Sequence, residues 1–324
     1  MKRILLLTTG GTIAMREQRP GEGAVPALEA ADLLAALPPG TLDLRVERVC
    51  NLPSAHLDLD TLWEVRTRVH RAVTAGEADG VVITHGTDTM EETAYLLDLT
   101  VPGEVPMVLT GAMRTASDPG YDGPANLLAA LRVAASDAAR GLGAMIVMND
   151  EVHAARFVTK THTLSPATFR SPGAGPLGGV AGGAMRRFFG VTRRTVEVPA
   201  LERRVALLKL AVGMGADLLE HLLDRGQVRG VVLEGLGGGR VPPWWVPAIA
   251  RAREQGVEVV VASRCPEGVV WDGYGYAGAH RDLARLDVLF AQGWNGQKCR
   301  IRLMAILGAA SDSAEIRNLW YTLP

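Results

Sequence analysis

The stretch Ile4-Leu5-Leu6-Leu7-Thr8-Thr9-Gly10-Gly11-Thr12-Ile13-Ala14 decides the fold of this chain. Its aliphatic run predicts a buried strand, and Gly10-Gly11 predict a sharp turn at the end of that strand, because glycine accepts positive φ without steric cost. Thr12 therefore follows the carboxyl end of a strand, which is where open α/β sheets bind ligands and carry out chemistry. Thr12 is a candidate nucleophile, although a threonine here also suits an ordinary helix N-cap or turn.

Composition limits the classes of function. The 324 residues are enough for two domains of ordinary size. With 34 Lys and Arg against 35 Asp and Glu, the net charge of −1 argues against nucleic acid or an acidic membrane surface as a partner. The three cysteines, Cys50, Cys265 and Cys299, are widely spaced, which predicts reduced thiols in a cytoplasmic protein. The first apolar run is too short for a signal peptide, and no stretch reaches the length of a membrane span.

Strand and helix signals alternate along the first part of the chain. The predicted strands cover 4–10, 44–50, 80–84, 106–110 and 144–148, and the predicted helices cover 27–37, 58–75 and 125–139. Short, fully apolar strands of this kind are buried on both faces of a parallel sheet. We therefore expect a doubly wound, flavodoxin-like parallel sheet, with residues 16–25 forming a mobile loop beside Thr12.

A change of composition marks the end of this first domain. Residues 173–183 are dense in glycine, and residues 186–204 mix basic residues with short apolar pieces. We expect an N-terminal α/β domain over 1–190, a linker over 191–204 and a smaller C-terminal α/β domain over 205–324. The second domain is predicted to have strands at 205–212, 230–234 and 257–262 and helices at 216–225, 243–254, 297–307 and 312–319.

Polar side chains follow four separate strands of the first domain, at the point where each strand ends. They are Thr12, Ser54, the pair Thr87-Asp88, and Arg114. Because the carboxyl ends of parallel strands meet at one edge of a sheet, we expect these side chains to face one crevice.

Residues 158–163 alternate apolar and polar residues like a hairpin strand and carry Lys160. A threonine hydroxyl needs a positioned base at neutral pH, and a lysine amine beside a carboxylate and hydroxyls can serve. N–H groups at the start of the helix after Asp88 would stabilise an oxyanion. Together with these N–H groups, the side chains of Thr12, Thr87, Asp88 and Lys160 suit acyl transfer. Alternatively, Asp88-Thr89-Met90-Glu91 is a capping box, and Lys160 extends to solvent.

Motifs for nucleotide, phosphate and metal binding each lack residues that they require. Gly235-Leu236-Gly237-Gly238-Gly239-Arg240 places Arg240 where a dinucleotide fingerprint needs its last glycine. Thr9-Gly10-Gly11-Thr12 lacks the lysine of a phosphate-binding loop, and the seven histidines show no metal-ligand spacing. The sequence predicts neither a metal nor a nucleotide cofactor.

Two of these stretches resemble the signatures of bacterial-type L-asparaginases, in the asparaginase/glutaminase family. They are Thr9-Gly10-Gly11-Thr12-Ile13-Ala14 and His85-Gly86-Thr87-Asp88-Thr89-Met90-Glu91-Glu92-Thr93-Ala94. The resemblance continues in order through the blocks Gly111-Ala112-Met113-Arg114, Asp122-Gly123-Pro124-Ala125-Asn126-Leu127, Val147-Met148-Asn149-Asp150, Thr159-Lys160-Thr161, Pro176-Leu177-Gly178 and Gln297-Lys298.

The resemblance implies hydrolysis of the side-chain amide of L-asparagine to L-aspartate and ammonia. Thr12 would be the nucleophile and form a β-aspartyl ester, supported by Thr87, Asp88 and Lys160. Asp88 would also hold the α-ammonium group of the substrate, and Ser54 and Gly11 would contribute to substrate binding. The resemblance further implies two α/β domains and assembly as a homodimer or homotetramer.

The chain departs from the family pattern at two places. The loop after the first signature has no tyrosine and offers residues such as Glu17 instead, and Gly238-Gly239-Arg240 stand where the family often has an asparagine supplied across the dimer. Tyr274 and Tyr276 are candidates for help from a partner subunit, and packing in a glycine-rich turn is an equal alternative.

Three other functions stay open at this point. One is a catalytically weak sensor of asparagine or aspartate with the same fold. Another is an ammonia-supplying amidotransferase subunit, although such a subunit ordinarily has an extra N-terminal domain and the signature here begins at residue 8. A third is a glutaminase-asparaginase, because rejecting one extra methylene contributes only about 1–3 kcal/mol.

Overall fold

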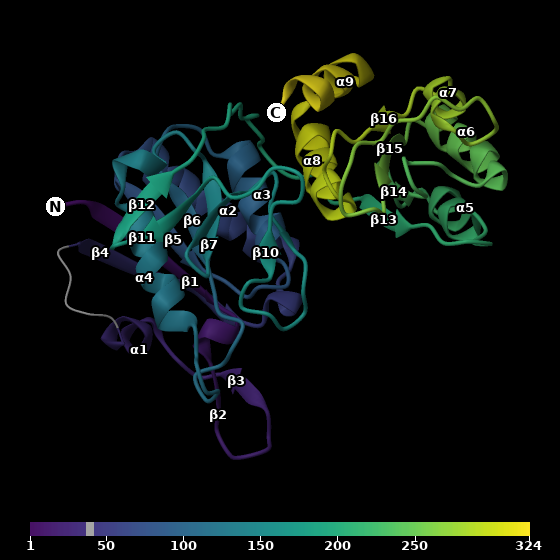
Figure 1. The fold of residues 1–324 in the computed structure, drawn as a ribbon. Helices are drawn as coiled ribbons and strands as arrows, with labels where there is room; N and C mark the ends of the chain where they lie inside the picture. The colour runs from purple at the N-terminus through teal and green to yellow at the C-terminus, as the bar shows by residue number, and fades with distance from the viewer. Residues whose placement is uncertain (37–41) are drawn as a thin grey trace. The chain divides into compact units, whose positions relative to one another are not determined.

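The computed structural model of the chain describes residues 1–36 and 42–324. It contains two units, Met1–Thr195 and Val196–Pro324, drawn from purple to teal and from green to yellow in Figure 1. The first holds an eight-stranded mixed sheet and the second a four-stranded parallel sheet, which confirms the predicted two-domain α/β class. No helix in these described ranges is long and apolar enough to cross a membrane.

Five strands of the first sheet run parallel. They are β1 (Arg3–Gly10), β4 (Asp43–Leu52), β5 (Gly80–Thr84), β6 (Met107–Thr110) and β7 (Ala144–Met148), in the spatial order β4-β1-β5-β6-β7. This is the flavodoxin-like order, in which the chain winds one way from β1 to β4 and the other way from β5 onward. In folds of this kind, ligands bind outside the carboxyl ends of the two strands at the reversal. Here these strands are β1 and β5, which Thr12 and Thr87 follow.

The predicted doubly wound parallel sheet is extended at one edge by antiparallel strands. There β8 (Glu151–Ala154), β11 (Gly178–Ala181) and β12 (Ala184–Arg187) add antiparallel strands in the order β12-β11-β8-β7. The glycine-dense segment 173–183, whose composition marks the end of the first domain, contains β11, which pairs on both sides. Short strands have too few residues to show a period, and glycine weakens the strand signal further.

Helices cover both faces of the parallel strands. On one face, α2 (Leu59–Thr74) and α3 (Met90–Thr100) pack on Leu5 and Leu7 of β1. On the other, α1 (Ala30–Ala35) and α4 (Gly123–Ala134) pack on Ile4 and Leu6. Both faces of β1 are buried, which explains its continuous apolar run.

Two predicted helices are shorter than expected. The helix predicted over 27–37 is α1, six residues long, and the last predicted residue, Leu37, lies outside the described residues. The helix predicted over 125–139 is α4, which ends at Ala134 and is followed by the 3₁₀ turn Asp137–Ala139. The helix predicted over 58–75 is confirmed as α2, with Asp58 as its N-cap accepting a hydrogen bond from the Thr61 N–H.

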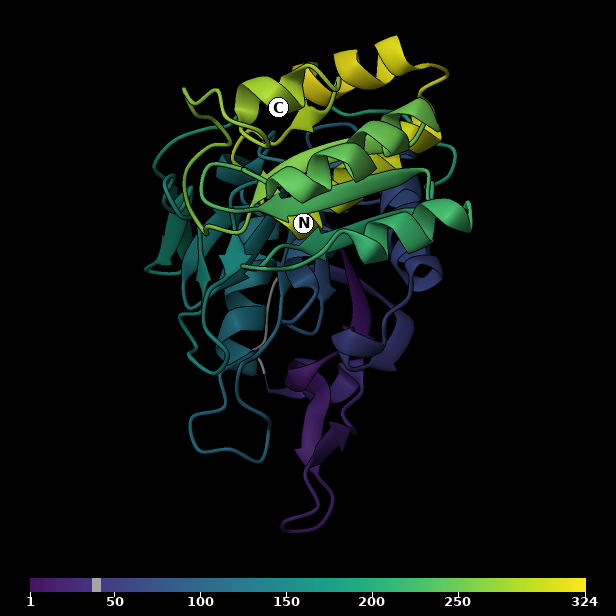
Figure 2. The ribbon, with the colours of Figure 1, turned by 90° about the vertical axis from the view of Figure 1, so that its right-hand side faces the viewer.

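Residues 16–25, predicted to form a mobile loop beside Thr12, include two short paired strands at the base of that loop. Strands β2 (Met15–Glu17) and β3 (Ala24–Pro26) pair antiparallel, with Arg16 opposite Val25. The hairpin that they form is drawn in purple and extends away from the sheet in Figure 2. Its base begins directly after the turn that carries Thr12.

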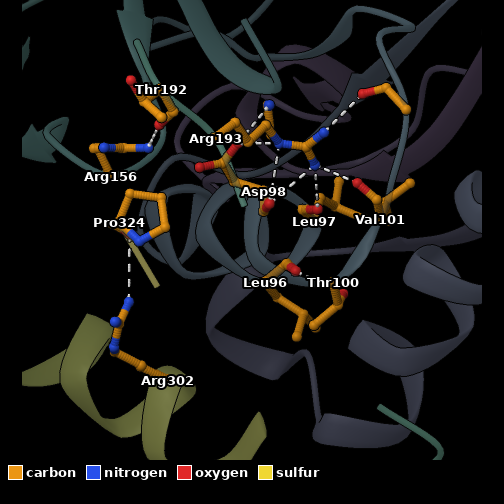
Figure 3. Close-up of polar contacts among 12 residues, drawn as sticks. Leu96, Leu97, Asp98, Thr100, Val101, Arg156, Thr192, Arg193, Arg302 and Pro324 are labelled. Carbon is orange, nitrogen blue, oxygen red and sulfur yellow. Dashed lines mark hydrogen bonds and ion pairs between the residues drawn. The ribbon is translucent and has the colours of Figure 1, made fainter. Parts of the chain in front are cut away.

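A largely buried arginine closes the carboxyl end of α3. The Arg193 guanidinium donates to the carbonyl oxygens of Asp98 at 2.9 Å and Gly103 at 2.9 Å and to that of Val101, and it pairs with the Asp98 carboxylate at 3.0 Å (Figure 3). A cation at a helix carboxyl end satisfies carbonyl groups that have no partner within the helix. Arg193 thereby fixes the last residues of the first unit to α3.

The second unit has the parallel strands β13 (Val205–Lys209), β14 (Gly230–Gly235), β15 (Glu258–Ser263) and β16 (Leu289–Phe290). Its helices are α5 (Asp217–Asp224), α6 (Val246–Glu254), α7 (His280–Ala284), α8 (Gly296–Ala309) and α9 (Ser313–Thr322). The predicted strand 205–212 ends early, at Lys209. Strand β16 and helix α7 were not predicted, because they are too short for a periodic signal.

The carboxyl end of the second unit is closed by a second arginine. Arg302 is fully buried on α8 and donates to the carbonyl oxygens of Trp320 and Leu323, each at 2.6 Å. Its guanidinium also lies 4.0 Å from the ring centre of Trp294, and Figure 3 shows its contact with Pro324. As with Arg193, a buried guanidinium satisfies the carbonyls of a helix end.

Candidate active site

Three strand ends meet through direct backbone contact. Gly11 has φ +82°, and a Cβ placed on it would lie 2.3 Å from the amide nitrogen and the Cα of Gly86. A Cβ placed on Gly86 would lie 2.6 Å from Ser54 Oγ. Glycine at both positions therefore lets the ends of β1, β4 and β5 approach closely. Thr12 and Thr87 each follow one of these glycines directly.

Thr12 begins a 3₁₀ turn over Thr12–Ala14, and its side chain is half-buried. Gly11 holds the N-cap position of this turn, with no side-chain cap. Of the two alternatives predicted for Thr12, the N-cap is therefore wrong, whereas Thr12 does lie in a turn. The turn is fixed at its base by the Gly11 N–H, which donates to the Leu52 carbonyl oxygen at 2.9 Å.

Lys160 reaches both polar side chains that follow β5. It lies on β9 (Thr159–Lys160), which pairs antiparallel with β10 (Phe169–Arg170), so the predicted hairpin strand is present but shorter. Lys160 Nζ lies 2.9 Å from Thr87 Oγ1 and 2.6 Å from Asp88 Oδ1. The Lys160 side chain is only 16% exposed, so it does not extend to solvent.

Asp88 does not cap helix α3, so the capping-box alternative is wrong. The N-cap of α3 is Thr89, without a side-chain cap bond, and the Asp88 carboxylate binds Lys160 while its side chain stays 65% exposed. Ser54 is buried beneath it, and Ser54 Oγ accepts a hydrogen bond from the Asp88 N–H at 3.2 Å. The Asp88 carboxylate thus has one oxygen on Lys160 and is largely open to solvent.

His85 is a functional candidate that the sequence reasoning missed. Its ring is buried, with Nδ1 2.7 Å from the Gly86 carbonyl oxygen and Nε2 2.9 Å from Thr93 Oγ1. Because a carbonyl only accepts, Nδ1 carries the proton and Nε2 accepts from Thr93. The neutral ring thus fixes the loop that carries Thr87 and Asp88. Its position directly before Gly86 in the second signature was the available signal.

We expect His85 to make the fold sensitive to acid. Burial lowers the pKa of His85 to about 4, whereas an exposed histidine titrates near 6.5. As the pH falls, the unfolded chain takes up the proton first, so stability present above pH 6.5 is lost down to pH 4, by about 3 kcal/mol. Urea unfolding across this range measures the loss. A His85→Asn variant should lose less stability over the same range, and equal losses in both proteins would contradict the assignment.

The hydrogen bonds of Arg114, which follows the end of β6, do not reach Lys160, Thr87 or Asp88. The Arg114 guanidinium donates to the Gly120 carbonyl oxygen at 3.1 Å, within its own exposed loop. The Asp122 carboxylate instead accepts from the N–H groups of Met113 and Arg114 and from Asn126 Nδ2. The prediction that Arg114 faces a shared crevice is therefore wrong, because its guanidinium bonds within its own loop. Sequence spacing does not reveal such a bond.

The other candidates have local contacts of their own. Glu17 is exposed on β2, and its N–H donates to Ser117 Oγ at 2.9 Å. Tyr274 and Tyr276 belong to the second unit, where their rings stack 5.6 Å apart and are each 53% exposed. The Arg240 guanidinium lies 4.8 Å from the Tyr274 ring centre and pairs with Asp272 at 2.9 Å.

The contacts bring together the Thr87 hydroxyl, the Asp88 carboxylate and the Lys160 amine. Beside them Gly11, which directly precedes Thr12, approaches Gly86. These groups can supply a nucleophile, a proton acceptor and a site for a cationic ligand, as acyl transfer requires. In the part of the chain that the structure describes, no group of three or more His, Cys, Asp or Glu side chains is placed to hold a metal ion.

Comparison with known proteins decides the family. The model for the N-terminal asparaginase domain matches residues 3–189, and that for the glutaminase/asparaginase C-terminal domain matches residues 204–320. The chain belongs to the asparaginase family. This confirms the resemblance seen in the two signatures, and the matches span both units of the fold.

Relatives in the asparaginase family align with nearly the whole chain. An L-asparaginase of Bacillus licheniformis is 34% identical, covering 96% of this chain and 97% of that protein. A glutaminase-asparaginase of Pseudomonas fluorescens biotype A is 32% identical, covering 99% and 90%. The crystal structure of a probable cytoplasmic L-asparaginase from Campylobacter jejuni superposes with a TM-score of 0.88 at 31% identity, covering 99% of both chains.

Proposed function

We propose that this asparaginase-family chain hydrolyses the side-chain amide of L-asparagine, with Thr12 as the nucleophile. The observation that carries the proposal is the contact of Lys160 Nζ with both Thr87 Oγ1 and Asp88 Oδ1, at 2.9 and 2.6 Å. These side chains follow the strand next to the one that ends before Thr12. The family supports the reaction, and this contact supports the roles of the individual residues.

In the first step, the Thr12 hydroxyl oxygen attacks the amide carbon and forms an ester bond. The hydroxyl proton passes through the group formed by Thr87 and Lys160 to the leaving nitrogen, the carbon–nitrogen bond breaks, and ammonia departs. Water then attacks the ester carbon, aspartate leaves, and the Thr12 hydroxyl regains its proton. A base positioned in this way contributes typically about 10² to 10⁴ in rate.

The same cluster suits the charged end of the substrate. Asp88 has one carboxylate oxygen on Lys160 and a largely exposed side chain, so it can also hold an α-ammonium group. Ser54 and Gly11 line the adjoining corner, where we assign contacts to the substrate. We also propose that Glu17, Tyr274 and Tyr276 assist the reaction at Thr12, with the two tyrosines contributed by a partner subunit.

The test is ammonia release from L-asparagine by the purified protein. We expect turnover, and after rapid acid quenching and digestion, peptide mass spectrometry should show one added aspartyl group on the peptide that contains Thr12. A thermal shift with L-asparagine but no ammonia release would instead support a sensor. Adduct on a different residue would refute the role of Thr12 and leave the reaction standing.

L-Glutamine is a second candidate substrate. The glutaminase-asparaginase relative is nearly as similar as the L-asparaginase, at 32% against 34% identity. One methylene separates the two substrates, and a pocket distinguishes that difference by only about 10- to 200-fold. The ratio of kcat/KM for the two amides measures the preference.

We also propose a cytoplasmic location and assembly as a homodimer or homotetramer. Cys50, Cys265 and Cys299 are all free thiols, which suits a reducing compartment. The assembly rests on family likeness, and sedimentation equilibrium measures it directly.

A further inference from the structure

A tyrosine from a distant loop holds the turn that contains Thr12. Tyr121 Oη donates to the Ile13 carbonyl oxygen at 2.5 Å, across 108 positions of sequence. The carbonyl oxygens on either side already have main-chain partners: Thr12 O accepts from the Met15 N–H, and Ala14 O accepts from the Ala27 N–H at 2.9 Å. Tyr121 thus supplies a donor to the carbonyl oxygen that lies between them.

The loop before Tyr121 binds the same segment twice more. We call residues 115–121 the strap. The Ala116 N–H donates to the Met15 carbonyl oxygen at 3.0 Å, and Ser117 Oγ accepts from the Glu17 N–H at 2.9 Å. The strap therefore bonds to alternate residues from Ile13 to Glu17, along the turn and the first strand of the β2–β3 hairpin.

Bonds within the loop stiffen the strap. Asp118 Oδ2 accepts from the Thr115 N–H at 2.7 Å and from Thr115 Oγ1 at 2.8 Å, and these bonds lower the pKa of Asp118 below its usual value. At the other end, a Cβ on Gly123 would lie 2.4 Å from Tyr121 Oη, so glycine there lets the ring lie against the start of α4. The tyrosine hydroxyl is presented from a fixed base.

We propose that Tyr121 is a positioning residue for the reaction, fixing the turn over Thr12–Ala14 so that the Thr12 hydroxyl points at the substrate carbon. This inference rests on the proposed role of Thr12. Displacing a reacting group by about 1 Å can slow an enzyme about 10²-fold. The loop after the first signature lacks a tyrosine, and Tyr121 brings a phenol to the same turn from elsewhere in the chain.

Tyr121 acts as a donor and not as a proton shuttle. Burial and the neighbouring Asp122 carboxylate raise the pKa of Tyr121 to about 12, so the phenol stays protonated at every working pH. A carbonyl acceptor also fixes the direction of its hydrogen bond. Its contribution to the rate should therefore be the same across the pH range in which the protein is folded.

The test is Tyr121→Phe, which keeps the ring and removes the hydroxyl. We expect kcat for L-asparagine to fall about 10-fold or more while KM stays within about 3-fold, because the turn moves and the binding groups of Ser54 and Asp88 do not. Tyr321→Phe is the matched control, since it removes another hydroxyl that bonds a main-chain group, the Phe290 N–H at 3.1 Å. It should keep wild-type kcat.

Two further measurements separate the explanations. The ratio of wild-type to Tyr121→Phe kcat should stay constant from pH 6 to 9, and a ratio that varies with pH would overturn a pure positioning role. Wild-type kcat in Tyr121→Phe would overturn the inference alone, provided that Thr12→Ala is inactive. Full activity in Thr12→Ala would overturn the proposed nucleophile and this inference together.

Discussion

Thr12→Ala should release ammonia from L-asparagine about 10³-fold or more slowly than the wild type, because it removes the oxygen that forms the ester. The fold should survive, since the turn is held by main-chain bonds and by Tyr121 rather than by the Thr12 side chain. A coupled ammonia assay measures the rate. A thermal shift with L-aspartate tests whether binding remains, because a ligand of the folded state raises the melting temperature.

Thr12→Ser is the matched control for this variant. It keeps a hydroxyl at the same position, so it should retain far more activity than Thr12→Ala. Thr87→Ala tests the competing assignment, since Thr87 is the second hydroxyl in contact with Lys160. If Thr12→Ala keeps more than about a tenth of wild-type kcat and Thr87→Ala is inactive, the nucleophile is Thr87.

Lys160→Met should lower kcat by about 10² to 10⁴, the range expected for the loss of a positioned base. Methionine keeps most of the length of the side chain but carries no amine to contact Thr87 and Asp88. KM should change little, because the Asp88 carboxylate stays available for the substrate's ammonium group. Steady-state kinetics with L-asparagine give both constants, and an unchanged kcat would remove Lys160 from the mechanism.

Lys160→Arg separates proton transfer from charge. Arginine keeps a positive charge beside Asp88 but does not release its proton at working pH. A rate as low as that of Lys160→Met supports Lys160 as the base, whereas substantial recovery shows that its charge is what matters. Lys209→Met is the control for loss of an exposed lysine, since Lys209 is paired loosely with Glu234 at 3.5 Å.

Much of the N-terminal unit follows from local sequence. The apolar run from Ile4 predicted β1 correctly, because a strand buried on both faces needs apolar side chains at successive positions. Gly10 and Gly11 both have positive φ, which their place at a strand end predicted. Strand order and the turn glycines together placed Thr12 and Thr87 at neighbouring corners, where the structure has Gly11 against Gly86.

Prediction from local sequence failed where a strand or helix is short, or where the bonding partner of a side chain is distant in the chain. The alternation over 158–163 predicted a strand that carries Lys160, but it did not reveal that the pairing of β9 with β10 brings the Lys160 amine to Asp88 from 72 positions away. The Asp88-x-x-Glu91 pattern predicted a cap, but the competing bond to Lys160 is invisible in a local window.

The sequence by itself determined the alternation of strands and helices, the glycine turns and the two signatures, because each depends on residues close together in the chain. Only the tertiary structure decided that the amine of Lys160 reaches Thr87 and Asp88, that His85 is buried and neutral, and that Tyr121 bonds to Ile13. These contacts join segments separated by tens of residues, or depend on the burial that such contacts create. Side-chain periodicity reports only on neighbouring residues, so it predicts neither the distant contacts nor the burial.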